Sequence, residues 1–287
     1  MGAAKSTQND EELHQRTIEL AYGEDTDLWT NLESDRSITA TKRLHYLICN
    51  DEFSWNHLHT TAQFNQLALA DLIIKSVDIS YRERVVFCVN NNGRTPLHYC
   101  SSSEMVELLV TSLPPHVRQN YLLHPDIDAC TAAHCAISLN RHDTLSSIWS
   151  LSNDTTREQL LSYRGVCEVS LLMEAGHCGN RETVCLVLNL YTDSDCWEET
   201  IMSASGRGET IRHPLVAHQW MEELAEILKT LTLEQRRRLL SLKNFWGYSP
   251  YQLALMAPHQ ISPNSQSDRR TYVTMWPSLQ RLKITDP

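Results

Sequence analysis

The sequence predicts an all-α fold, a solenoid of tandem helical repeats with short turns and an extra short helix in each repeat. Two patterns support this prediction: a turn-and-helix motif recurs along the 287 residues, and an arginine followed by an apolar pair recurs with it. The composition agrees, because 41% hydrophobic and 21% charged residues are typical of a folded chain with a substantial core.

The clearest copy of the motif is Asn92-Gly93-Arg94-Thr95-Pro96-Leu97-His98, followed by an apolar helical segment at 104–110. Glycine suits a tight turn, Thr95 suits a helix N-cap, and Pro96 suits the first helical position, where no N–H is needed. The segment resembles the ankyrin repeat, whose signature is T-P-L-H-x-A, with Cys100 in the place of the alanine. The resemblance implies a stack of helix-turn-helix units.

The same chemistry recurs along the chain. The positions equivalent to Thr95 are predicted at 56, 95, 131, 170, 213 and 249. The spacings are then 39, 36, 39, 43 and 36 residues, longer than the roughly 33 of an ankyrin repeat. The last two copies are expected to begin at His213-Pro214-Leu215 and Ser249-Pro250-Tyr251, with proline at the first helical position. Asn65, Asn140 and Gly179 are predicted at turns between helices, where they tolerate a positive φ.

A second recurring pattern explains the greater length of these repeats. Before most turns, a basic residue stands a few positions ahead of an apolar pair. The cases are Arg82 with Val85-Val86, Arg118 with Leu122-Leu123, Arg157 with Leu160-Leu161, Arg236 with Leu239-Leu240 and, more faintly, Arg43 with Leu47-Ile48. Because cap-like residues precede these segments, the pattern predicts a short third helix in each repeat and a reduced hairpin turn.

The predicted organisation has four parts and no independent second domain. Residues 1–10 form a flexible N-terminus, 11–50 are capping helices, 51–257 are ankyrin-like repeats, and 258–287 are a C-terminal capping segment. Terminal repeats of a solenoid are expected to be atypical because one of their faces has no neighbouring repeat.

Charge and cysteine content narrow the class of protein. A net charge of −10 argues against a nucleic-acid partner, which would require a basic face. The nine cysteines form no C-x-x-C pair and are odd in number, which favours reduced thiols and a cytoplasmic location. No stretch approaches the length of a membrane span. We expect a monomer.

The N-terminus carries a lipidation pattern, because Met1-Gly2-Ala3-Ala4-Lys5-Ser6 fits the signal for N-myristoylation. Gly2 is therefore a candidate lipidation site. One acyl chain gives only weak membrane association, and acidic residues at 10–12 follow instead of a basic patch. An alternative to a purely cytoplasmic protein is a signalling adaptor held peripherally at a membrane through Gly2.

No catalytic, cofactor or metal site is predicted. The resemblance implies that His59, His98 and His134 join neighbouring turns by hydrogen bonds, and a position that repeats favours a structural role over catalysis. The His134-Cys135 and His177-Cys178 pairs are interpreted as helix neighbours with diverging side chains and buried thiols. Cys130, His134 and Cys135 are too loosely spaced for a structural zinc site. Gly206-Arg207-Gly208 is interpreted as a flexible linker.

The resemblance implies a non-enzymatic protein–protein interaction scaffold or adaptor that needs no cofactor and whose partner is unidentified. The turn positions differ between repeats, as a partner-specific surface would. They are Asn92 and Arg94, Asp128 and Cys130, Cys167 and Val169, and Trp246 and Tyr248. Because arginine and aromatic residues are common interface anchors, Arg94, Trp246 and Tyr248 are the predicted partner-binding residues. Packing of Trp246 on the terminal repeat is the alternative, and an enzyme with an unrecognised site is a remote one.

Overall fold

The computed structural model describes residues 55–191, 194–249 and 252. The predicted N-terminal segments at 1–10 and 11–50, with Gly2 and Arg43, and the capping segment at 258–287 lie outside these residues. The described residues form helices and turns, with isolated β-bridges at Pro125–Thr131 and Gly165–Val169 and no strand. The chain divides into two compact units, Met1–Arg157 and Glu158–Pro287.

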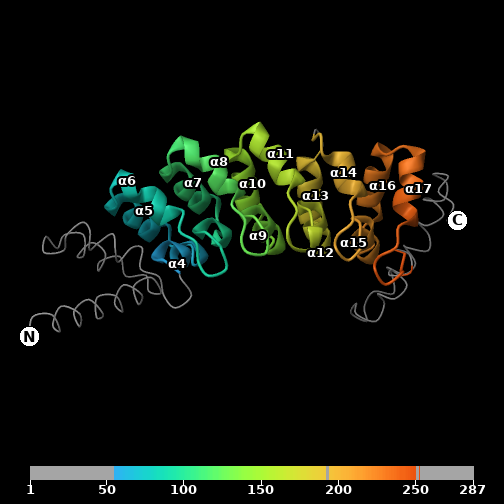
Figure 1. The fold of residues 1–287 in the computed structure, drawn as a ribbon, viewed down its shortest axis with the longest axis horizontal. Coiled ribbons are helices and arrows are strands. Elements are labelled where there is room, and N and C mark those ends of the chain that lie inside the picture. The colour runs from blue at the N-terminus through green and yellow to red at the C-terminus, as the bar shows by residue number, and fades with distance from the viewer. Residues whose placement is uncertain (1–54, 192–193, 250–251, 253–287) are drawn as a thin grey trace, which may run out of the picture. The chain divides into compact units, whose positions relative to one another are not determined.

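Unit 1 contains three successive repeats, each with a first, a second and a third helix. Their helices are α4 (His57–Gln63), α5 (Leu67–Ser76) and α6 (Ile79–Val86), then η1 (Pro96–Tyr99), α7 (Ser103–Ser112) and α8 (Pro115–Leu123), then α9 (Ala132–Ser138), α10 (His142–Leu151) and α11 (Asp154–Ser162). Within this unit the first helices α4 and α9 lie along the lower edge of Figure 1, and the second helices lie above them.

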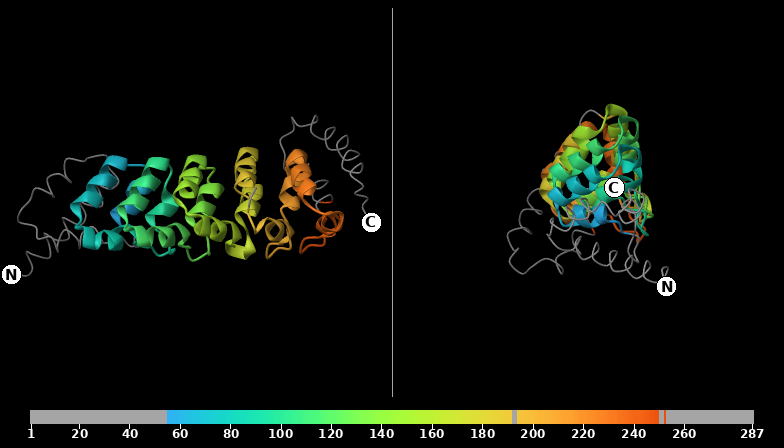
Figure 2. Two further views of the ribbon diagram at one scale, coloured as in Figure 1. Left: turned by 90° about the horizontal axis from the view of Figure 1, so that it is seen from above. Right: turned by 90° about the vertical axis from the view of Figure 1, so that its left-hand side faces the viewer.

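Unit 2 begins within α11 and continues the same pattern. Its helices are η2 (Val166–Glu168), α12 (Leu171–His177), α13 (Arg181–Leu190), α14 (Trp197–Met202), α15 (Arg212–Ala217), α16 (Met221–Thr230) and α17 (Leu233–Ser241). Seen from above, the helices of neighbouring repeats within a unit stand side by side (Figure 2). Each repeat therefore buries its apolar face against the next repeat of its unit.

The predicted third helix is confirmed, and the structure shows what its arginine does. The Nε atoms of Arg82, Arg118 and Arg236 donate to the carbonyl oxygens of Val77, Leu113 and Leu231, at 3.1, 2.9 and 2.9 Å. Each acceptor is the C-cap residue of the preceding second helix. The arginine thus satisfies a carbonyl that the helix leaves without a partner, and it joins the second helix to the third.

Arg118→Ala is expected to lower the free energy of unfolding by about 2 kcal/mol, because hydrogen bonds from a charged donor are stronger than neutral ones. Arg118 also donates to Thr111 O at 2.9 Å, so two bonds are lost. Urea unfolding followed by circular dichroism would measure the effect. Exposed Arg84→Ala is the matched control, expected to change stability by less than about 0.5 kcal/mol. Equal effects of the two substitutions would contradict the capping role.

The N-caps define the repeat period and correct one predicted position. The caps at Asn56, Thr95, Thr131 and Ser170 are confirmed, but the next repeat begins at Thr210, not at 213. Thr210 N–H donates to His213 Nδ1 at 3.0 Å, just as Thr95 N–H donates to His98 Nδ1 at 3.1 Å.

The correction makes the repeats more regular. From Asn56 to Ser249, which forms reciprocal hydrogen bonds with Gln252, the spacings are 39, 36, 39, 40 and 39 residues. Pro214 lies within α15, in its first turn, where a missing N–H is tolerated. Pro214 is therefore not the first residue of its helix. Because the prediction assumed that it was, the start of this repeat was predicted three residues too late.

The turns between first and second helices follow the prediction. Asn65, Asn140 and Gly179 have φ values of 55°, 54° and 71°, and Gln219 adopts the same conformation at 62° without having been predicted. The repeat that starts at Thr95 is the short one, because its first helix η1 has four residues where α4 and α9 have seven.

One core position carries an unexpected charge. Leu58, Leu97 and Leu172 are buried two residues after their N-caps, and the equivalent residue in the Thr210 repeat is Arg212, which is also buried. Arg212 Nη1 donates to the carbonyl oxygens of Leu239 and Leu240 at the C-terminal end of α17. The partial negative charge of that helix end stabilises the guanidinium.

Candidate partner-binding surface

The turns that precede the first helices share one hydrogen-bonded framework. They are turn 1 (90–94), turn 2 (126–130), turn 3 (165–169), turn 4 (205–209) and turn 5 (244–248). In each, the first residue's N–H donates to the carbonyl of the fifth, at 2.8 to 3.0 Å. In turns 1, 2, 4 and 5 a side-chain oxygen of the first residue also accepts the N–H groups two and four residues later. The residues that provide this oxygen are Asn90, Asp126, Ser205 and Asn244.

Backbone hydrogen bonds also join neighbouring turns within each unit. In unit 1, Ile127 N–H donates to Asn92 O at 3.0 Å. In unit 2, Gly206 N–H donates to Cys167 O at 2.6 Å, and Phe245 N–H donates to Arg207 O at 2.7 Å. The backbone of the turns is therefore held in place, while the side chains at the tips differ.

Turn 4 corrects the interpretation of Gly206-Arg207-Gly208 as a flexible linker, because these residues are the tip of a regular turn. Gly208 has φ 72°, and it stands two residues before Thr210 as Gly93 stands two residues before Thr95. That spacing was a usable sequence signal, but it was hidden by the wrong starting position at 213.

Gly208→Ala is expected to destabilise unit 2 by about 2 kcal/mol, through a strained positive φ and a steric clash. A Cβ on Gly208 would lie 3.0 Å from the backbone nitrogen of Phe245, in turn 5. Gly206→Ala is the milder comparison, because Gly206 does not have a positive φ and a Cβ there would lie 3.3 Å from Cys167 O, a tight contact that only a small shift relieves. Thermal unfolding of both variants would test this. A linker would tolerate both substitutions equally.

The structural role implied for the repeated histidines is confirmed at two of them. His59 Nε2 contacts Arg94 O at 2.8 Å, and His98 Nε2 contacts Cys130 O at 3.2 Å, so each joins its first helix to the following turn. In both, Nδ1 accepts the N–H of the N-cap residue, which places the ring proton on Nε2. Burial lowers the pKa of His98 to about 4. His134 Nδ1 accepts the Thr131 N–H in the same way, at 3.3 Å.

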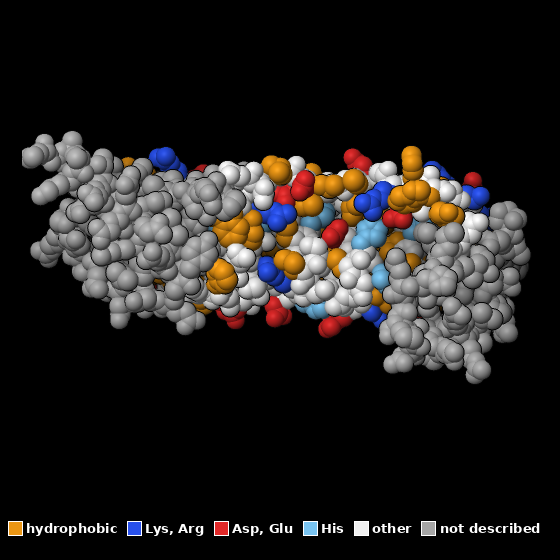
Figure 3. All heavy atoms as spheres, turned by 90° about the horizontal axis from the view of Figure 1, so that it is seen from below, with side chains coloured by type: hydrophobic (Ala, Val, Ile, Leu, Met, Phe, Trp, Pro, Cys, Tyr) orange, Lys and Arg blue, Asp and Glu red, His pale blue; other side chains and the backbone are white. Residues whose placement is uncertain are grey.

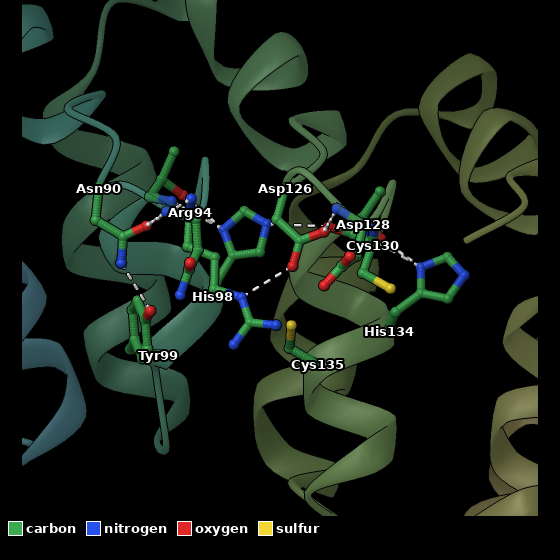
Figure 4. Close-up of polar contacts among 12 residues, drawn as sticks. Asn90, Arg94, His98, Tyr99, Asp126, Asp128, Cys130, His134 and Cys135 are labelled. Carbon is green, nitrogen blue, oxygen red and sulfur yellow. Dashed lines mark hydrogen bonds and ion pairs between the residues drawn. The ribbon is translucent and has the colours of Figure 1, made fainter. Parts of the chain in front are cut away.

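Arg94 is held by the neighbouring turn. Its Nε donates to Asp126 Oδ2 at 2.8 Å, and the other oxygen of that carboxylate accepts the N–H groups of Asp128 and Cys130 (Figure 4). The Arg94 side chain is 32% exposed and that of Asp126 is fully buried. This geometry makes Arg94 a link between turns 1 and 2, with part of its surface still accessible to a partner.

Trp246 and Tyr248 lie together on turn 5, where both backbone N–H groups donate to Asn244 Oδ1 at 3.1 and 3.0 Å. Trp246 is 57% exposed, whereas Tyr248 is half-buried. Seen from below, the described residues of each unit show hydrophobic side chains interspersed with charged ones (Figure 3).

Comparisons with known proteins identify the fold. The family model described as ankyrin repeat matches residues 92–118, which include η1 and α7. The ankyrin repeat domain of Bcl-3, a member of the IkappaB protein family, superimposes with a TM-score of 0.54 and 14% identity, covering 86% of this chain and 98% of that one. The ankyrin repeat protein EF0377 superimposes with a TM-score of 0.55 and 15% identity, covering 75% and 96%. The chain has the ankyrin-repeat fold. No curated protein sequence matches it.

Ankyrin repeats are in general protein–protein interaction modules and typically non-enzymatic. Burial, followed by the charge of Glu174, raises the pKa of the Cys178 thiol to about 11. His177 Nε2, beside it, lies 3.3 Å from Glu209 Oε2. No group of three His, Cys, Asp or Glu side chains within the described ranges is placed to hold a metal ion. None of the described helices is long and apolar enough to cross a membrane.

Sequence reasoning missed three exposed apolar residues at the tips of the turns. They directly follow the first residue of turns 2, 3 and 5: Ile127 is 69% exposed, Val166 is 43% exposed and Phe245 is 81% exposed. The prediction considered the third and fifth residues of the turns and so omitted the second. An apolar residue placed next to Asp126, Gly165 or Asn244 was the available signal.

Proposed function

We propose that this chain is a non-enzymatic protein-binding scaffold that holds its partner on the turn tips. The observation that carries the proposal is a fixed turn backbone bearing variable, exposed side chains. The recurring hydrogen bonds within and between turns order the tips before binding. A pre-organised surface loses less conformational entropy when a partner binds.

The tip chemistry supports recognition of a protein surface. Ile127, Val166, Phe245 and Trp246 are exposed large apolar residues in the turns that precede the first helices. Exposed apolar groups set among polar ones are typical of interaction sites, where they become the buried centre of the interface. The ring nitrogens of His59 and His98, by contrast, form hydrogen bonds with the backbone of their N-caps or of the following turns. This supports a binding role over catalysis.

Proximity labelling in cells tests the proposal. A turn-tip variant would replace Ile127, Val166, Phe245 and Trp246 with serine. Its matched control would replace four exposed apolar residues on the helices, Leu67, Ile79, Tyr81 and Leu233, also with serine. We expect the turn-tip variant to lose protein neighbours that the wild type and the control both label. Retention of all neighbours by a folded turn-tip variant would overturn the proposal.

A further inference from the structure

Turns 4 and 5 bring exposed aromatic and basic side chains together in unit 2. Phe245 and Trp246 are 81% and 57% exposed, and their rings meet edge to face at 6.4 Å. Arg207 is exposed at the tip of turn 4, and Lys243 is exposed just before turn 5. We call these four residues the turn 4–5 patch.

The backbone places the two halves of this patch side by side. Phe245 N–H donates to Arg207 O at 2.7 Å, so the two tips are in direct contact. Close packing at Gly208, where a Cβ would lie 3.0 Å from Phe245 N, shows that the contact leaves no room between the turns. Arg207 and Phe245 are therefore exposed residues on adjacent turns whose backbones are in contact.

The turn 4–5 patch carries two exposed positive charges, from Arg207 and Lys243. Among the described residues, neither Arg207 nor Lys243 forms an ion pair. The acidic residue of turn 4, Glu209, has a side chain that is only 16% exposed, and its Oε2 lies 3.3 Å from His177 Nε2. The chain as a whole carries a net charge of −10, so two exposed cations beside two exposed aromatic rings are a local departure from its overall charge.

We propose that the turn 4–5 patch binds an acidic protein segment in which Asp or Glu stands next to apolar side chains. Phe245 and Trp246 would cover the apolar side chains, and Arg207 and Lys243 would pair with the carboxylates. Aromatic residues and arginine supply most of the binding energy in many interfaces, and opposite charge adds specificity and association rate. The inference rests on the proposed scaffold function and names the chemistry of one partner site.

A short segment fits the charges better than an extended anionic surface. A membrane or a nucleic acid spans many Debye lengths and would face the repulsion of the chain's net negative charge. A peptide contacts only the patch and its immediate surroundings. The observations therefore favour a protein segment, and the other two partners become outcomes of the test.

The test is selection of random linear peptides on the full-length chain, followed by fluorescence anisotropy of the enriched peptides. We expect enriched sequences with Asp or Glu beside Leu, Phe or Trp, and affinities that fall as salt is raised. Trp246→Ala should weaken binding about 30-fold, and the double variant Arg207→Glu with Lys243→Glu about 10-fold. Leu233→Ala and Lys75→Glu, at exposed positions outside the patch, should change the affinity less than about twofold.

Three results would overturn the inference: no enrichment of acidic peptides, binding unchanged by Trp246→Ala, or tighter binding of phosphatidylserine vesicles or single-stranded RNA through the same four residues. Trp246 and Phe245 are exposed, so their loss should leave folding intact, which circular dichroism would verify. The two proposals fail separately. If the turn-tip variant loses its cellular neighbours while the peptides show no acidic preference, only the partner chemistry is wrong.

Discussion

Asp126→Ala is expected to lower the free energy of unfolding by about 3 kcal/mol, because it removes a buried carboxylate with three hydrogen bonds. The carboxylate accepts the N–H groups of Asp128 and Cys130 and binds the Arg94 guanidinium. Its side chain is fully buried, so these groups lose a partner that no other side chain replaces. The effect is below the upper range for a buried pair because Arg94 remains partly hydrated.

Asp126→Asn is the informative control, since asparagine occupies the same place in turns 1 and 5, as Asn90 and Asn244. Its amide oxygen keeps the acceptor for the two backbone N–H groups and loses only the charge. We expect it to cost less than half as much as alanine. Urea unfolding, with hydrogen exchange at Asp128 and Cys130, would measure both variants. Equal costs for asparagine and alanine would show that the turn does not depend on the accepted N–H groups.

Acidification from about pH 7 to about pH 4.5 is expected to remove about 2.5 kcal/mol of stability through His98 alone. Burial lowers the pKa of His98 to about 4, below its unfolded value of 6.5. Protonation would put a hydrogen on Nδ1, which accepts the Thr95 N–H. The unfolded chain therefore binds the proton first, so this stability is complete above pH 6.5 and is lost as the pH falls toward 4.

The measurement is urea unfolding at the two pH values for the wild type and for His98→Gln. The variant should be less stable at pH 7 but should lose about 2 kcal/mol less on acidification. Burial also lowers the pKa of His124, which would add to the acid sensitivity in both proteins. The comparison therefore isolates His98. A variant with the same pH dependence as the wild type would exclude His98 as the source.

Much of the repeat could be predicted from the sequence, because the residues that define it act on neighbours only a few positions away. The N-caps at Asn56, Thr95, Thr131 and Ser170 precede their helices directly, and a cap acts on N–H groups two or three residues away. The recurring arginines predicted a third helix, but not that they donate to the end of the second. Turn 4 was missed because Pro214 was taken for the start of a helix that begins two residues earlier.

The exposure of the predicted partner-binding residues could not be predicted from the sequence. Trp246 and Tyr248 lie two residues apart on turn 5, but Trp246 is 57% exposed and Tyr248 is half-buried. Arginine is a common residue at interfaces, but the Nε of Arg94 donates a hydrogen bond to Asp126, 32 residues later in the chain. Arg207 and Phe245 lie 38 positions apart and become neighbours only through stacking of the turns.

The sequence by itself determined where four of the repeats begin, that the repeats contain a third helix, and the positive φ of Asn65, Asn140 and Gly179. Caps, turns and helical periodicity depend on residues a few positions apart, so a single sequence carries these signals. Only the tertiary structure decided which arginines form ion pairs or hydrogen bonds, which tip residues are exposed, and which turns contact one another. Those features depend on contacts between residues about one repeat apart, and such contacts form only when one repeat stacks on the next.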